Sequence, residues 1–150
     1  MRKGVKSMET VTEIPVRYAE TDQMGVVYHS NYLIWLEVAR THFLEELGFP
    51  YIAMEKAGCI SPVIDCELHY GAPFTYGDVV CVYTRVTKVT PVRTEYSYRL
   101  FLKGEDPESC KPRFTGSTVH CVVDKDTFKP VSQKREFPDL FEAYKRVVTE

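Results

Sequence analysis

The residues best suited to chemistry lie in one short loop, where Asp22, Gly25 and His29 precede a long apolar segment that starts near Asn31. An isolated Asp in a loop is more often a turn former or a helix cap than a catalyst. Asp22 nevertheless lies about eight residues ahead of the predicted helix, which is too far for a simple N-cap. A helix N-terminus offers unpaired N–H groups and the positive end of the helix dipole. A carboxylate just ahead of it is therefore the first candidate for a reactive group.

His29 is the second titratable group in this loop, and its side chain is compatible with a general base, a ligand for a bound group or an ordinary loop residue. The other histidines, His42, His69 and His120, fall in helix and strand patterns without a common metal-ligand spacing. The five cysteines show no C-x-x-C spacing, and most fall in apolar strand patterns, where reduced Cys behaves as a small hydrophobe. We therefore expect no metal site.

The element that must position these residues is a helix predicted from Asn31 to Leu47, where apolar residues recur at helical spacing. Ser30 or Asn31 is the predicted N-cap, and Gly48 followed by Pro50 ends the helix. The apolar stripe is wide, which predicts a helix that is covered on most of its sides.

The rest of the chain reads mainly as strands. Alternating apolar and polar residues predict a half-buried strand from Val11 to Tyr18, followed by the loop 19–28. Four further strands are predicted at 60–70, 79–89, 92–103 and 114–123, and a short amphipathic helix at 138–148. This order predicts an α+β fold, with one curved, five-stranded antiparallel sheet around one buried helix.

The bulk composition excludes several classes of protein. With 150 residues, 44% hydrophobic and 27% charged, the chain fits one globular domain over 1–150, of which residues 1–9 are expected to form a flexible tail. A net charge of -2 favours neither a nucleic-acid partner nor an acidic membrane surface. No apolar run approaches the ~18 residues of a spanning helix, and the basic start lacks the apolar stretch of a secretory signal. We therefore expect a soluble, cytoplasmic protein without a membrane span.

Three pieces of the chain match a known pattern. They run Asp22-Gln-Met-Gly-Val-Val-Tyr-His-Ser-Asn-Tyr32, Trp35-Leu-Glu-Val-Ala-Arg40 and Tyr70-Gly-Ala-Pro-Phe-Thr-Tyr-Gly-Asp78. These pieces resemble the 4-hydroxybenzoyl-CoA thioesterase family, in its YbgC-like acyl-CoA thioesterase branch. The similarity extends from about residue 11 to about residue 123. It implies the hotdog fold, in which a curved antiparallel sheet wraps a long helix.

The resemblance implies hydrolysis of an acyl-CoA thioester without a metal or cofactor. At the position of Asp22 the family has a nucleophile or a general base for water, and the thioester carbonyl points at a backbone N–H at the helix start, here that of His29. The carbonyl oxygen gains negative charge on attack, which a helix N-terminus can stabilise. The expected substrate-binding residues are Gly25, Val26, Val27, Tyr28, Asn31 and Tyr32, although for Tyr32 we favour core packing. The resemblance also implies a homodimer or homotetramer with sites between subunits.

Several alternatives compete with this assignment. Glu37 is a second carboxylate on the helix, and some other hotdog thioesterases use such a Glu, although we favour an ion pair or surface position near Arg40 or Thr41. Basic residues that could meet the CoA phosphates are Lys88, Arg93, Lys111 and Arg113. At the level of function, the alternatives are a non-catalytic acyl- or protein-binding hotdog module and a thioesterase acting on acyl carrier protein. An enoyl-thioester hydratase is a poorer match.

Overall fold

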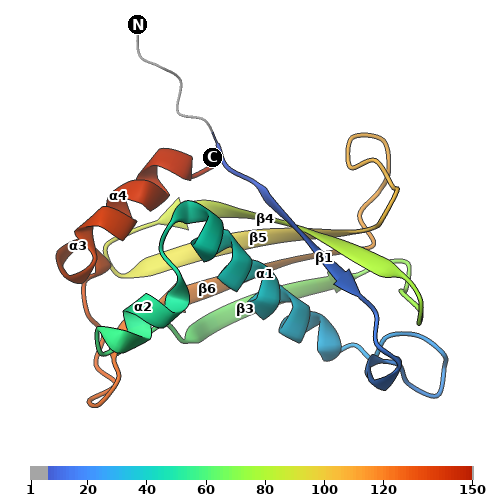
Figure 1. Cartoon of the computed structure of the whole chain (residues 1–150), viewed down its shortest axis with the longest axis horizontal. Helices are drawn as coiled ribbons and strands as arrows, with labels where there is room; N and C mark the ends of the chain where they lie inside the picture. Colours follow the sequence, from blue (N-terminus) through green and yellow to red (C-terminus); the bar gives the residue numbers. More distant parts are fainter. Residues whose placement is uncertain (1–6, 150) are drawn as a thin grey trace, which may run out of the picture.

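The computed structural model describes residues 7–149, and its main feature is one antiparallel sheet with helices on one side (Figure 1). The strand order is β1-β4-β5-β6-β3. The strands are β1 (Thr10–Pro15), β3 (Val63–Tyr70), β4 (Val79–Val89), β5 (Arg93–Leu102) and β6 (Phe114–Cys121). β2 (Cys59–Ile60) and β7 (Val123–Asp124) pair separately as a short antiparallel ladder. The predicted meander is confirmed, because β4, β5 and β6 are neighbours in sequence order.

Helix α1 (Asn31–Leu47) packs on this sheet and contacts β1 and β4. Alternate residues of β4 and β5 face it, because successive side chains of a strand point to opposite faces. Those with 0–1% exposure are Val80, Val82, Thr84, Val86, Tyr96, Tyr98 and Leu100. From the helix, Trp35, Leu36, Ala39 and Phe43 are buried to the same degree. The predicted α+β architecture of one long helix on a five-stranded antiparallel sheet is therefore confirmed.

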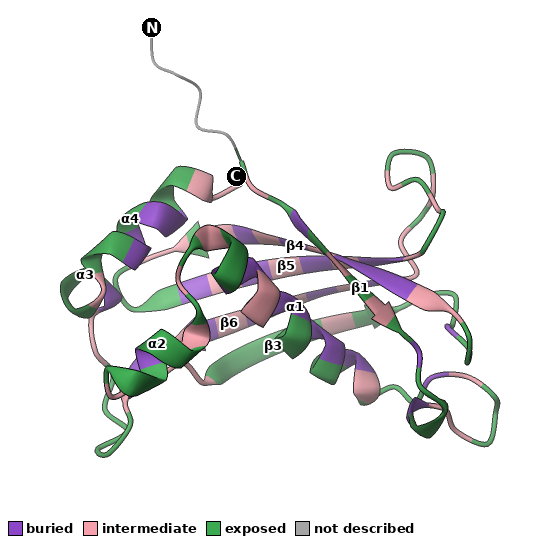
Figure 2. Cartoon of the chain, in the orientation of Figure 1, coloured by how far each residue is buried: buried purple, intermediate pink, exposed green. Residues whose placement is uncertain are grey.

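The outer face of α1 differs from the prediction of a helix covered on most sides. Leu33, Ile34 and Val38 are 38%, 52% and 47% exposed, and green segments alternate with purple along the helix in Figure 2. A single sheet can bury only the stripe that faces it, so the additional apolar residues remain open in one copy of the chain. This leaves an apolar surface without a partner in the chain itself.

Two predicted strands end earlier or break. The strand expected to reach Tyr18 stops at Pro15, and Tyr18 begins a short 3₁₀ helix, η1 (Tyr18–Glu20), with 76% of its surface exposed. The strand expected over 60–70 is divided into β2 and β3, and the register between β3 and β6 shifts between Val63 and Asp65. Pro62 lies at this break, where it has no N–H to give to a ladder.

The remaining helices lie near the C-terminal end of α1. They are α2 (Tyr51–Lys56), α3 (Gln133–Glu136) and α4 (Pro138–Val147). Of these, α2 contacts α1, and α4 contacts β4. On α4, Leu140, Phe141 and Tyr144 are buried, and the Tyr144 hydroxyl shares a hydrogen bond with that of Tyr96 on β5. None of the helices in the described part of the chain is long and apolar enough to cross a membrane.

The flexible tail expected at 1–9 falls partly outside the described residues, which begin at 7. Within them, the Met8 N–H donates to the Val147 carbonyl at 3.4 Å, and Glu9 pairs with Arg99 on β5 at 3.1 Å. The start of β1 therefore lies beside the end of α4, and both described ends of the chain meet there (Figure 1).

Candidate functional site

The loop that carries Asp22 is a tight hairpin in front of α1. Thr21 and Val27 form an isolated antiparallel bridge across its base. Inside the hairpin, the Asp22 N–H donates to the Val26 carbonyl at 2.9 Å, and the Gly25 N–H donates to the Asp22 carbonyl at 3.0 Å. Gly25 has a φ of 77°, in the left-handed region that residues with a Cβ rarely adopt. The glycine is therefore required by the turn itself.

Asp22 is partly buried, and its two carboxylate oxygens differ. Oδ1 accepts the Met24 N–H at 2.8 Å, which is the bond of a turn-forming Asp. Oδ2 has no hydrogen-bond partner among the residues that the structure describes. The carboxylate is thus held by one oxygen and presents the other, so a role in the turn and a role in chemistry are compatible.

The N-terminus of α1 lacks the side-chain cap that the sequence predicts. Ser30 is at the N-cap position but makes no capping hydrogen bond, and the Asn31 side chain instead donates to the Glu20 carbonyl at 2.8 Å. The backbone N–H of His29 has no acceptor within residues 7–149. The first turn also carries no acidic side chain. An unsatisfied N–H at the positive end of a helix of 17 residues is a ready site for developing negative charge.

Glu20 is the residue of this site that the sequence reasoning missed. It is 3% exposed, and its carboxylate accepts the Arg17 N–H at 2.8 Å and the Trp35 indole N–H at 2.6 Å. Burial by itself raises the pKa of Glu20, but the hydrogen bonds from Arg17 and Trp35 outweigh this effect, and the pKa is lowered overall. A signal for it was available, because a buried Trp needs an acceptor for its indole N–H.

Aromatic rings surround the open side of the site. The Tyr70 hydroxyl, at the end of β3, donates to the His29 carbonyl at 2.8 Å. The His29 ring lies 4.3 Å from the Tyr28 ring and 6.5 Å from the Tyr70 ring, measured between centroids. Tyr28 and Tyr70 are 46% and 48% exposed, so these rings form an accessible surface beside the helix start.

The predicted substrate-binding residues do not all face this surface. Val27 and Tyr32 are each 4% exposed. The Val27 N–H donates to the Phe74 carbonyl at 2.9 Å, and the Tyr32 ring stacks on Phe114 with centroids 4.9 Å apart. Burial raises the pKa of the Tyr32 hydroxyl. Val27 and Tyr32 therefore pack in the core beneath the accessible surface, as expected for Tyr32.

Glu37, the competing carboxylate, is in an ion pair. Its Oε2 lies 2.9 Å from Arg40 Nη2, and its carbonyl accepts the Thr41 hydroxyl at 2.9 Å. The buried Arg40 guanidinium has a raised pKa although its burial opposes the charge, because Glu37 accepts a hydrogen bond from it. Glu37 is six residues into α1, about 9 Å along the axis from Asn31. The ion pair expected for Glu37 is present.

Arg113, one of the basic residues considered for the CoA phosphates, is bound to other residues of the chain. Its guanidinium donates to Glu105 Oε1 at 2.6 Å and 3.0 Å, and to the Pro73 carbonyl at 3.1 Å. It also lies 5.6 Å from the centre of the Phe74 ring. Since Phe74 in turn accepts the Val27 N–H, Arg113 stabilises the segment beneath the Asp22 loop.

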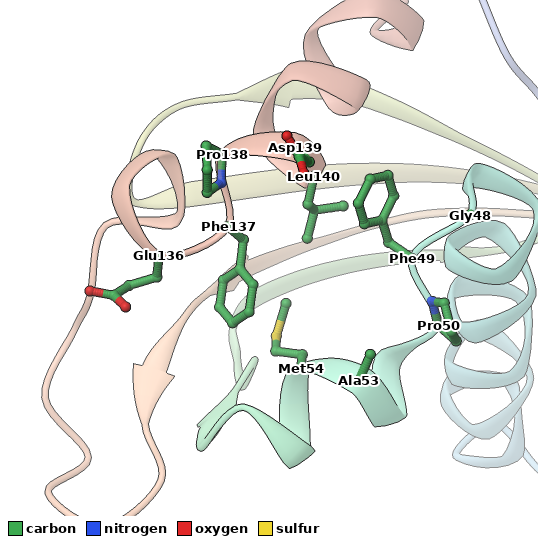
Figure 3. A pocket seen from close by; sticks show the side chains of 10 residues that line it. All are labelled: Gly48, Phe49, Pro50, Ala53, Met54, Glu136, Phe137, Pro138, Asp139 and Leu140. Atoms are coloured by element: carbon green, nitrogen blue, oxygen red, sulfur yellow. The ribbon is translucent and has the colours of Figure 1, made fainter.

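A cavity of about 270 Å³ lies elsewhere, between α2 and the α3–α4 corner (Figure 3). Phe49, Met54, Phe137 and Leu140 give it an apolar lining. It lies at the Gly48 end of α1, and a helix of 17 residues places it about 25 Å from the Asp22 loop. The cavity is therefore separate from the predicted site. The described residues also contain no His, Cys, Asp and Glu group that could hold a metal ion.

Comparison with known proteins shows the family to which the chain belongs. The family described as thioesterase-like superfamily matches residues 16–143. A putative acyl-CoA thioesterase of Bacillus subtilis, YneP, is 42% identical over 134 residues, which are 89% of this chain and 94% of that protein. The acyl-CoA thioesterase YbgC of Helicobacter pylori is 24% identical over 85% of this chain and 96% of its own length. A DHNA-CoA thioesterase structure from Staphylococcus aureus is 45% identical with a TM-score of 0.86, covering 93% of this chain and 90% of that one.

Proposed function

Because the chain belongs to the thioesterase-like superfamily, we propose that it hydrolyses an acyl-CoA thioester to a free acid and CoA, with Asp22 as the reactive carboxylate. The observation that carries this proposal is the free N–H of His29 at an uncapped helix N-terminus, next to the hairpin that holds Asp22. A carboxylate can act as base or nucleophile and a preorganised N–H donor can stabilise the oxyanion, so the two together are sufficient for thioester hydrolysis.

In the proposed reaction the thioester carbonyl oxygen accepts the His29 N–H. Asp22 either removes a proton from water, so that hydroxide attacks the carbonyl carbon, or attacks that carbon itself through Oδ2. Both routes form a tetrahedral oxyanion at the helix N-terminus, where the dipole and the N–H lower its energy. The C–S bond then breaks and CoA leaves as the thiolate. In the second route, water subsequently cleaves the Asp22–acyl anhydride and restores the carboxylate.

The acyl group that fits best is aromatic. The accessible surface beside the helix start consists of the Tyr28, His29 and Tyr70 rings, and aromatic rings pack favourably on one another in offset or edge-to-face geometry. The 45% identical Staphylococcus aureus relative is named a DHNA-CoA thioesterase, so DHNA-CoA is the first compound to test.

A second copy of the chain is the proposed partner, as a homodimer or homotetramer. β3 is an edge strand with β6 on one side only, and its Val63 and Ile64 are 47% and 46% exposed. The apolar outer face of α1, which includes Ile34 and Val38, is also open. An unpaired edge beside apolar surface is a template for pairing with another chain. Light scattering at micromolar concentration tests this proposal, and a monomer would contradict it.

The experiment that tests the function is a thiol-release assay with short-chain, long-chain and aromatic acyl-CoAs, DHNA-CoA included. We expect Asp22→Asn to lower kcat on the order of 10²-fold or more with little change in KM, because it removes an interaction made in the transition state. Asp126→Asn, on an exposed turn after β7, is the matched control and should retain wild-type activity. Normal turnover in Asp22→Asn would refute the catalytic assignment.

Two alternative functions predict different results in the same assay. A non-catalytic acyl-binding module would bind acyl-CoA saturably without releasing thiol. A thioesterase for acyl carrier protein would be silent on the CoA panel and active on acylated carrier protein.

A further inference from the structure

We propose that Glu20 is the positioning residue of this site and that it fixes the Asp22 carboxylate relative to the His29 N–H. This inference rests on the function proposed above. Glu20 itself is 3% exposed and has both carboxylate oxygens bonded inside the protein, so it acts through its neighbours and not on the substrate.

The backbone of Glu20 closes the reactive loop. The loop leaves Glu20 toward Asp22 and returns at Tyr28, whose N–H donates to the Glu20 carbonyl at 2.9 Å. The same carbonyl accepts the side-chain N–H of Asn31, the first residue of α1, at 2.8 Å. One carbonyl oxygen therefore ties the return of the loop and the start of the helix together. Asp22 lies two residues after Glu20 in the sequence. His29 lies between Tyr28 and Asn31, the two residues that bind the Glu20 carbonyl.

The side chain of Glu20 joins the same anchor to the interior of α1. Oε1 accepts the Arg17 N–H at 2.8 Å, and Oε2 accepts the Trp35 indole N–H at 2.6 Å. Trp35 is 1% exposed and lies one turn into the helix, so it is a rigid reference point. Arg17 Nε lies 3.3 Å from Glu20 Oε1, so the guanidinium balances the charge of the Glu20 carboxylate. The Arg17 side chain itself is 72% exposed.

Both oxygens must accept, and only a carboxylate can do this. The Arg17 and Trp35 donors approach different oxygens of Glu20. A glutamine of the same size has one oxygen and one NH₂ group, so its NH₂ must face one of the two N–H donors. Glu20→Gln therefore conserves volume and breaks one anchor of the loop. A displacement of about 1 Å between reacting groups costs on the order of 10²-fold in rate.

The test compares Glu20→Gln with Glu9→Gln, which alters a carboxylate paired with Arg99 on the sheet, outside the loop. The readouts are kcat, KM and amide hydrogen exchange by mass spectrometry over 21–30, all measured well below the melting temperature. For Glu20→Gln we expect kcat to be about 10- to 100-fold lower than in the wild type and KM to stay within about threefold. The rate of amide exchange should rise more over 21–30 than in β5, each compared with the wild type. Glu9→Gln should match the wild type in all three.

A double variant distinguishes a positioning role of Glu20 from general destabilisation of the fold. Trp35→Phe removes one of the two donors, so a glutamine at position 20 no longer has to face an N–H at that oxygen. We expect the double variant to have a kcat no lower than Glu20→Gln alone, whereas independent effects would multiply. Wild-type kcat in Glu20→Gln, or an equal rise in exchange throughout the chain, would overturn the proposal.

Two further outcomes have defined meanings. If the wild type hydrolyses no thioester, the proposed function fails, while hydrogen exchange over 21–30 still decides whether Glu20 orders the loop. If Glu20→Gln does not fold, Asn31→Ala removes only the bond to the Glu20 carbonyl and should accelerate exchange over 21–30. Unchanged exchange in Asn31→Ala would then refute the anchor.

Discussion

His120 makes the stability of the fold sensitive to mild acid. The imidazole is 2% exposed on β6, where its Nε2 lies 2.9 Å from the Thr118 hydroxyl and its Nδ1 3.4 Å from the Ser61 carbonyl. Burial, reinforced by the charge of Arg40, lowers the pKa of His120 from 6.5 to about 4. The Tyr96 ring packs edge-on against it, 5.5 Å away. The native state thus holds this histidine neutral.

The sign of the effect follows from which state binds the proton. Above pH 6.5 His120 is neutral in both states and contributes no pH dependence. As the pH falls below 6.5, the unfolded chain takes up a proton that the native state accepts only near pH 4, so stability decreases. Each pH unit in this window costs about 1.4 kcal/mol, so lowering the pH from 8 to 5 costs about 2 kcal/mol through this one group.

Urea unfolding at pH 8 and pH 5, at one fixed protein concentration, measures this cost. His120→Gln keeps hydrogen-bonding capacity toward Thr118 and Ser61 but cannot be protonated. We expect the wild type to lose about 2 kcal/mol more than His120→Gln between the two pH values, which is about 1 M in the urea midpoint. Equal losses in the two proteins would refute the assignment of a depressed histidine pKa.

Two further predictions concern the supports of the loop. Tyr70→Phe removes the hydroxyl that donates to the His29 carbonyl, and we expect kcat/KM to fall about fivefold for the loss of about 1 kcal/mol. Tyr76→Phe, with a ring that is 65% exposed, is its control, and equal activity of the two variants would argue against the anchor. Gly25→Ala places a Cβ at a φ of 77°, so thermal denaturation should show a loss of about 1 kcal/mol. Gly25→Asn should recover part of it, because Asn tolerates this conformation.

The sequence was sufficient where local signals agreed. The helix from Asn31 to Leu47 was predicted with its observed bounds, because its apolar spacing ends at Gly48 and Pro50. Gly48 does adopt a left-handed φ of 95°. The order of β4, β5 and β6 followed from short connections.

The sequence was insufficient where individual side-chain bonds, or a second chain, decide the structure. The strand predicted to reach Tyr18 stops early because the backbone turns into η1, where the Glu20 carboxylate accepts the Arg17 N–H. Tyr70 reaches the His29 carbonyl across 41 positions of the chain, which no local spacing encodes. Ser30 was predicted as a cap from its type, whereas its side chain makes no capping hydrogen bond. The open outer face of α1 was missed because a wide apolar stripe does not say which chain will cover it.

The closed base of the Asp22 hairpin has a consequence for how this protein can change. The backbone enters and leaves the hairpin through bonds that do not involve its tip, where Met24 is 80% exposed. Substitutions at Gln23 and Met24 other than proline can therefore accumulate without moving the backbone that carries Asp22, because the tip holds the Asp22 carboxylate through the Met24 N–H and not through a side chain. The tip can therefore vary in sequence, whether by natural drift or by directed evolution, while the hairpin keeps its shape.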